Sequence, residues 1–150
     1  MTPPHPGLWY DDWAWSLPLI VLTVVIHVLG LGLFTDRTVP ALSGMIARGH
    51  RTATFIVEMG ATVLLATILH GVEAMIWAVA YLVLGALPSA RSAMLYSLSS
   101  MTTYGHAHVF LEERWQLMGA LEALNGIILF GMTTAFLFAA IQRTWPLGRR

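Results

Sequence analysis

Residues 99–109 read SSMTTYGHAHV, a stretch rich in hydroxyl and imidazole side chains with a single glycine. It lies between apolar segments that are each long enough to cross a lipid bilayer. Irregular backbone at membrane depth is tolerated only where protein covers it or where it lines a water-filled cavity. The stretch therefore predicts a sheltered loop that faces water. Three spans from one chain are too few to enclose such a loop, so we expect a homo-oligomer.

The composition is typical of a membrane protein rather than a soluble domain. Apolar types make up 57% of the 150 residues and charged types 11%, with a mean hydropathy of +0.69. Eight arginines balance eight acidic residues, and a net charge of zero excludes broad electrostatic attraction to nucleic acid. The lack of cysteine excludes disulfides, thiol chemistry and cysteine-based zinc sites. The length fits one compact unit.

Three membrane-spanning helices are predicted, within residues 17–35, 52–87 and 116–142. The middle run is unusually long, since one helix of 36 residues extends about 54 Å, more than the thickness of a bilayer. We interpret it as one tilted helix rather than two short spans. With the N-terminus outside, three spans leave six of the eight arginines in the cytoplasm, which fits the positive-inside tendency.

The predicted organisation therefore has five parts, of which the fourth is the largest. They are an outer N-terminal segment with an aromatic belt (1–16), a first transmembrane helix (17–35), a basic cytoplasmic linker (36–51), a domain of two spans (52–143) and a short cytoplasmic tail (144–150). Within the fourth part, a short helix is predicted at residues 89–101, because Pro88-Ser89 is a helix-start signal. This helix extends about 20 Å, too short to cross the bilayer. The loop of residues 102–109 follows it.

This layout, with a span, a half-crossing helix, a threonine-led loop and a second span, resembles the pore of bacterial potassium-channel-like proteins. AMLYSLSSMTT (93–103) is similar to the pore helix of that family, which leads into T-T-V-G-Y-G-D. HGVEAMIWAVAYLVLGAL is similar to its outer helix and LMGALEALNGIILFGMTTAFLFA to its inner helix. The register places these residues on the seven filter positions: Thr102, Thr103, Tyr104, Gly105, His106, Ala107 and His108.

The resemblance implies a homotetrameric channel, not an enzyme, in the bacterial inner membrane, with the C-terminus in the cytoplasm. In the family, rings of backbone carbonyls replace the hydration shell of the ion, so the implied ion pathway is residues 102–107. No cofactor is expected beyond permeant monovalent cations, potassium foremost. Because Ala107 stands where the family has its second glycine, relaxed selectivity and a non-conducting relative are alternatives.

In the last span, three residues are expected to shape the ion pathway below the loop. Asn125 and Thr133 are predicted to line a cavity, and Gly126 is the hinge candidate. Glu122 is expected to reach behind the loop.

His70 and Glu73 are three residues apart and share one helix face. Near the bilayer centre an unpaired charge costs at least about 2.5 kcal/mol, which predicts a partner for Glu73. One hypothesis is a structural pair that braces this helix against the short helix near Ser97 or Ser100. The other is a metal or proton site with His27 as third ligand, which would make the chain a membrane metal- or haem-binding redox protein.

His106 and His108 form a second candidate set of metal ligands. Facing the outer mouth of a tetramer, they would form a ring of imidazoles able to bind a transition metal or to block the pore when protonated at about pH 6. Alternatively, His106 packs behind the loop and His108 is solvated.

Overall fold

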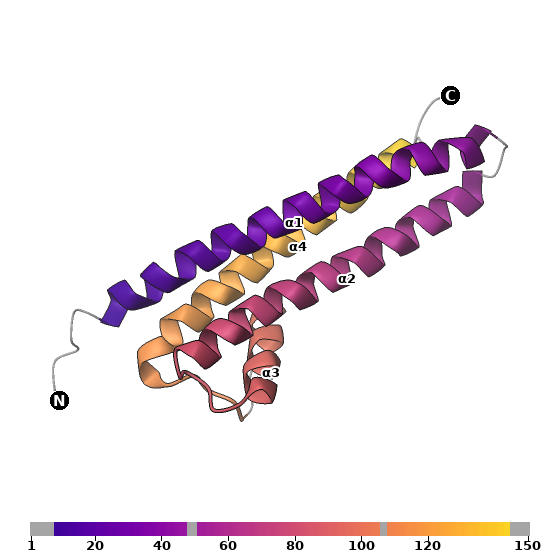
Figure 1. The fold of residues 1–150 in the computed structure, drawn as a ribbon. Coiled ribbons are helices and arrows are strands. Elements are labelled where there is room, and N and C mark those ends of the chain that lie inside the picture. Colours follow the sequence, from indigo (N-terminus) through magenta and orange to yellow (C-terminus); the bar gives the residue numbers. More distant parts are fainter. Residues whose placement is uncertain (1–7, 48–50, 106–107, 145–150) are drawn as a thin grey trace.

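The computed structural model describes residues 8–47, 51–105 and 108–144, and every regular element in these ranges is a helix. Three long helices lie side by side, namely α1 (Leu8–Ala47), α2 (Arg51–Val83) and α4 (Gln116–Thr144). The short helix α3 (Ala90–Met101) lies at one end of this bundle, and the 3-10 turn η1 (Glu113–Trp115) leads into α4 (Figure 1).

The three long helices are apolar and long enough to cross a membrane, over Trp9–Thr38, Thr52–Val83 and Glu113–Arg143. The predicted all-α architecture with three candidate spans is therefore confirmed. The middle run is one continuous helix, as expected. The predicted cytoplasmic tail lies almost entirely outside the described residues.

Helix α1 extends beyond the predicted first span at both ends. It begins at Leu8, so the aromatic residues Trp9, Tyr10 and Trp13 are exposed on its first turns. It continues through Pro40 to Ala47. Proline is tolerated inside membrane helices because neighbouring groups compensate for the missing N–H. Most of the predicted linker (36–51) is thus a continuation of α1 rather than a separate segment.

Helix α2 ends four residues before the predicted boundary because Gly85 adopts a left-handed conformation, with φ of 67°. The backbone N–H of Ala86 donates to the carbonyl of Tyr81 at 2.8 Å, and that of Gly85 to the carbonyl of Leu82 at 3.1 Å. This pair of bonds is the Schellman motif, which satisfies the last carbonyls of a helix.

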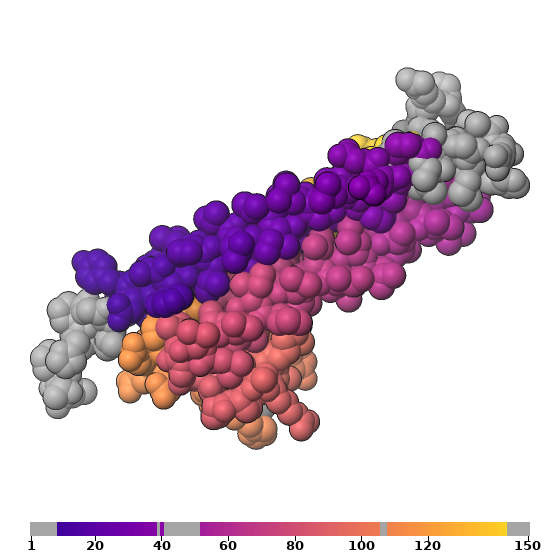
Figure 2. All heavy atoms as spheres, viewed as in Figure 1, coloured from indigo at the N-terminus to yellow at the C-terminus, as the bar shows by residue number. Residues whose placement is uncertain are grey.

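Helix α3 begins where the sequence predicts a cap. The Ser89 hydroxyl accepts a hydrogen bond from the backbone N–H of Ser92 at 3.2 Å. With 12 residues, α3 extends about 18 Å, roughly half of a bilayer. It forms a lobe, together with the loop after it, on one side of the bundle where α2 ends and α4 begins (Figure 2).

Two polar contacts join the helices near opposite ends of the bundle. Near the α3 end, the Asp12 carboxylate on α1 accepts a hydrogen bond from the backbone N–H of Met118 at 2.9 Å, which caps the first turn of α4. Near the other end, the Arg143 guanidinium lies 2.5 Å from the carboxylate of buried Glu58.

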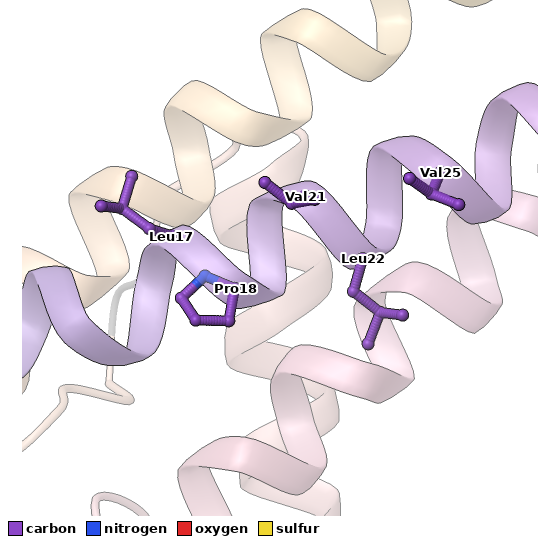
Figure 3. A pocket seen from close by; sticks show the side chains of 5 residues that line it. All are labelled: Leu17, Pro18, Val21, Leu22 and Val25. Carbon is purple, nitrogen blue, oxygen red and sulfur yellow. The ribbon is translucent and has the colours of Figure 1, made fainter.

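The outer surface of α1 is apolar over residues 17–25, as expected for a surface that faces lipid. Leu17, Pro18, Val21, Leu22 and Val25 line a depression of about 560 Å³ on it (Figure 3). All five residues belong to α1, so this depression is a feature of the helix surface and not a gap between helices.

Close packing of α3 against α4 depends on Gly126. A Cβ atom at this position would lie 2.7 Å from the Cα atom of Met101, the last residue of α3. Small residues allow membrane helices to approach this closely. Because α4 remains helical through Gly126, packing explains this glycine without bending, and a hinge role stays a prediction.

Gly126→Ala is expected to lower the free energy of unfolding by about 1–3 kcal/mol, because the new methyl group overpacks a backbone contact. Gly131→Ala is the matched control, since no atom lies within 4 Å of a Cβ built there. That substitution should be neutral or slightly stabilising, because alanine favours a helix by about 1 kcal/mol over glycine. Thermal unfolding in detergent, followed by circular dichroism, measures both; equal melting temperatures would contradict the packing role.

Candidate functional site

The loop after α3 begins with a strained residue. The backbone N–H of Thr103 donates to the carbonyl of Ser100, and that of Tyr104 to the carbonyl of Ser99, both at 3.0 Å. This pair of bonds is again the Schellman motif, which requires a left-handed residue just after the helix. Thr103 is that residue, with φ of 55°. For a residue with a Cβ atom this conformation costs about 1–2 kcal/mol. Strain of this kind concentrates at functional sites.

The loop residues have little cover within one chain. Thr102, Thr103 and Gly105 are exposed, and the Tyr104 side chain is 87% exposed. Gly105 also has a left-handed backbone, with φ of 85°. The predicted filter residues His106 and Ala107 lie outside the described residues. His108 is exposed.

Glu122 on α4 holds α3 against α2, as expected for a residue behind the loop. The Tyr81 hydroxyl on α2 donates to one Glu122 carboxylate oxygen at 2.6 Å. The Ser97 hydroxyl on α3 bonds the other oxygen, and its Oγ also lies 2.7 Å from the carbonyl of Ala74. Glu122, Tyr81 and Ser97 are completely buried. One carboxyl group thus connects three helices. No motif or spacing in the sequence marks Tyr81 as a partner of Glu122.

Removal of the Tyr81 hydroxyl is expected to leave a Glu122 oxygen buried without its partner. Tyr81→Phe should therefore cost about 1–3 kcal/mol of the free energy of unfolding. Tyr10→Phe is the control, because Tyr10 is 77% exposed. Thermal unfolding of the two variants in the same detergent compares them, and an equally small loss in both would exclude a structural role for the Tyr81–Glu122 contact.

A second candidate site is a polar cluster in the middle of the bundle. The two oxygens of Glu73 face two imidazoles: Oε1 lies 2.8 Å from Nδ1 of His27, and Oε2 lies 3.1 Å from Nδ1 of His70. On the other side of the rings, Thr133 Oγ1 lies 3.0 Å from His27 Nε2 and 3.2 Å from His70 Nε2. The cluster joins α1, α2 and α4. We refer to these four residues as the His–Glu cluster.

The His–Glu cluster is almost completely buried inside the protein. His27 and Glu73 are fully buried, whereas the His70 side chain is 15% exposed. The His70 ring stacks on the ring of Phe130, with centroids 4.4 Å apart. His70 is therefore the residue that connects the buried cluster to the protein surface.

The structure corrects the expected partner of the His70–Glu73 pair. One of the two hypotheses placed the pair near Ser97 or Ser100 of the short helix, but Ser97 bonds Glu122 and Ser100 bonds the carbonyl of Gly119. Glu73 instead uses both oxygens for histidines. His27, predicted as the third ligand, lies next to His70 and Glu73, and the three residues have possible ligand atoms within 4.8 Å of one another.

The predicted cavity-lining role of Asn125 and Thr133 is also corrected. Both are buried inside the bundle: the Asn125 amide donates to Thr23 Oγ1 at 2.9 Å, and Thr133 belongs to the His–Glu cluster. Hydropathy alone does not reveal which way a helix is rotated about its axis. Thr23 and His27 on α1 form hydrogen bonds with Asn125 and Thr133, so these two residues of α4 point into the bundle.

Comparison with known proteins identifies no relative: no family model matches the chain, nor does any curated protein or solved structure. The two sites therefore carry the inference about function. The loop offers exposed residues with a left-handed backbone at Thr103 and Gly105, and the His–Glu cluster offers imidazole and carboxylate groups.

Proposed function

We propose that the chain is one subunit of a homotetrameric, potassium-channel-like cation channel in the bacterial inner membrane. The observation that supports this most is the exposed loop of residues 102–105 at the tip of a half-length helix. In a bilayer its peptide groups need partners, because lipid offers none. Neighbouring copies around a central, water-filled axis would provide that shelter.

In this proposal the carbonyls of Thr103, Tyr104 and Gly105 bind cations that have lost part of their hydration shell. Left-handed residues between right-handed ones turn successive carbonyls to the same side, and both Thr103 and Gly105 have positive φ. The Thr102 hydroxyl donates to the carbonyl of Leu98 at 2.7 Å, so it braces the end of α3. The Thr103 hydroxyl would form the innermost ring.

The proposed pore continues through His106 and Ala107, with relaxed selectivity for potassium because an alanine replaces a glycine there. The chain acts as a channel and not as an enzyme, with membrane lipid and its own copies as partners. Its orientation has the N-terminus outside and the C-terminus in the cytoplasm, as the arginine distribution favours.

A haem-based redox function is less well supported than a channel. Two axial histidines bind haem iron from opposite faces of the porphyrin. The ring centroids of His27 and His70 are 5.1 Å apart and their planes are inclined by 36°, which leaves no room for a macrocycle between them. A non-conducting relative is the remaining alternative, and a flux measurement separates it from a channel.

Reconstituted liposomes are expected to show cation flux that depends on the protein. Gly105→Ala should abolish most of this flux, because alanine resists the left-handed backbone at Gly105 by about 1 kcal/mol in each chain. Potassium, sodium and proton fluxes are compared at neutral and mildly acidic pH.

Gly85→Ala is the matched control, since Gly85 also has positive φ and also has no atom within 4 Å of a built Cβ, but lies outside the loop. Its flux should equal that of the unmodified protein. Flux that is the same with and without protein would exclude a channel and favour the non-conducting relative. Equal losses in both variants would exclude the loop as the ion pathway.

A further inference from the structure

Thr133 favours one arrangement of the hydrogen atoms in the His–Glu cluster. Its hydroxyl has one hydrogen, which it donates to the carbonyl of Leu129 at 3.1 Å. Its oxygen then only accepts, so both contacts with the rings are hydrogen bonds only when each imidazole presents an Nε2–H group to it. A neutral imidazole has one N–H group, and here that group is used. In this tautomer the Nδ1 atoms of His27 and His70 carry lone pairs.

Those two lone pairs face another pair of acceptors. Each Nδ1 atom lies within 3.1 Å of a Glu73 carboxylate oxygen, and an ionised carboxylate has no hydrogen to donate. Four electron-donating atoms thus converge in a buried place. Such an arrangement is stable only with positive charge between the atoms, because desolvated lone pairs repel one another.

We propose that the His–Glu cluster binds one divalent transition-metal ion of the zinc class. The ligands are Nδ1 of His27, Nδ1 of His70 and the carboxylate of Glu73. Two imidazoles and one carboxylate form a ligand set that zinc uses in proteins, at about 2.0–2.2 Å from the ion. Because the ligand atoms already lie within 4.8 Å of one another, only small shifts are needed to enclose an ion.

Thr133 supplies the outer contacts that such a site needs. A histidine that binds a metal usually donates its other N–H to a nearby oxygen, which fixes the tautomer and the orientation of the ring. One hydroxyl does this for both rings here. The ion would connect α1 and α2 directly and α4 through Thr133, and His70 is the way in because only its side chain is partly exposed.

Protons are the competing occupants. Two protons would fill the two Nδ1–oxygen contacts and leave the cluster with the same charge as a dication does. A single added proton satisfies all four ring contacts only if Thr133 gives up the Leu129 carbonyl and donates to one ring. The neutral Nδ1–H tautomers need no added proton, but they leave at least one Nε2 atom facing the Thr133 oxygen without a hydrogen between them. Metal binding is therefore the property to measure. It is independent of the loop, so its failure would leave the proposed channel function untouched.

Full-length protein in detergent, freed of metal by chelation, is titrated with Co²⁺, whose ligand-field absorption reports the ligands, and with Zn²⁺ in competition. We expect one ion per chain. Glu73→Gln should weaken binding at least about 100-fold, as expected for a lost ligand, and the isosteric Thr133→Val about 10- to 100-fold. His108→Asn and Glu112→Gln are matched controls, because both residues are exposed and outside the cluster. Their affinities should not change.

Absence of stoichiometric Co²⁺ binding by the folded, unmodified protein would overturn the proposal and leave protons as the occupants. Binding that is lost in His108→Asn but kept in Thr133→Val would overturn it as well. If Glu73→Gln does not fold, X-ray absorption of the Zn²⁺-loaded unmodified protein decides: two imidazole ligands with a carboxylate support the site, and fewer imidazoles contradict it.

Discussion

A helix that is too short to cross the bilayer must be held from the side, and here one buried carboxyl group does this. Glu122 bonds Tyr81 of α2 and Ser97 of α3, and Gly126 allows α3 to lie directly against α4. Because all three side chains are fully buried, each of these polar groups depends on the others. The position of the loop follows from this contact, because the loop begins where α3 ends.

Helix α1 contributes a row of polar side chains to the interior of the bundle. Asp12 caps α4, Thr23 accepts the Asn125 amide, and His27 bonds Glu73. Each of these contacts satisfies a buried polar group on α2 or α4 that lipid would leave unpaired. A two-span pore architecture has no such helix, and these contacts give α1 a physical role within the protomer while its outer surface stays apolar.

The sequence predicted the features that depend on hydropathy and local signals. These include the three spans, the cap at Ser89 and the need of Glu73 for a partner. It named His70 and His27 as partners in only one of two hypotheses, because His27 is 46 residues away and the choice depends on helix rotation. The rotation of α4 about its axis was equally unknown, so Asn125 and Thr133 were predicted to line a cavity although both are buried inside the bundle. The continuation of α1 past residue 35 to Ala47 was missed because the hydropathy falls at the basic segment that follows, although the helix continues through Pro40.

The proposed function requires that loops of neighbouring copies meet, and cross-linking at Tyr104 tests this most directly. The chain has no cysteine, so Tyr104→Cys introduces a single thiol. In membranes treated with a short bis-maleimide, we expect covalently linked pairs of chains. Val21→Cys on the outer surface of α1 should remain unlinked under the same conditions. Tyr104→Cys chains that stay single would show that the loops do not meet, and the channel architecture would then be wrong.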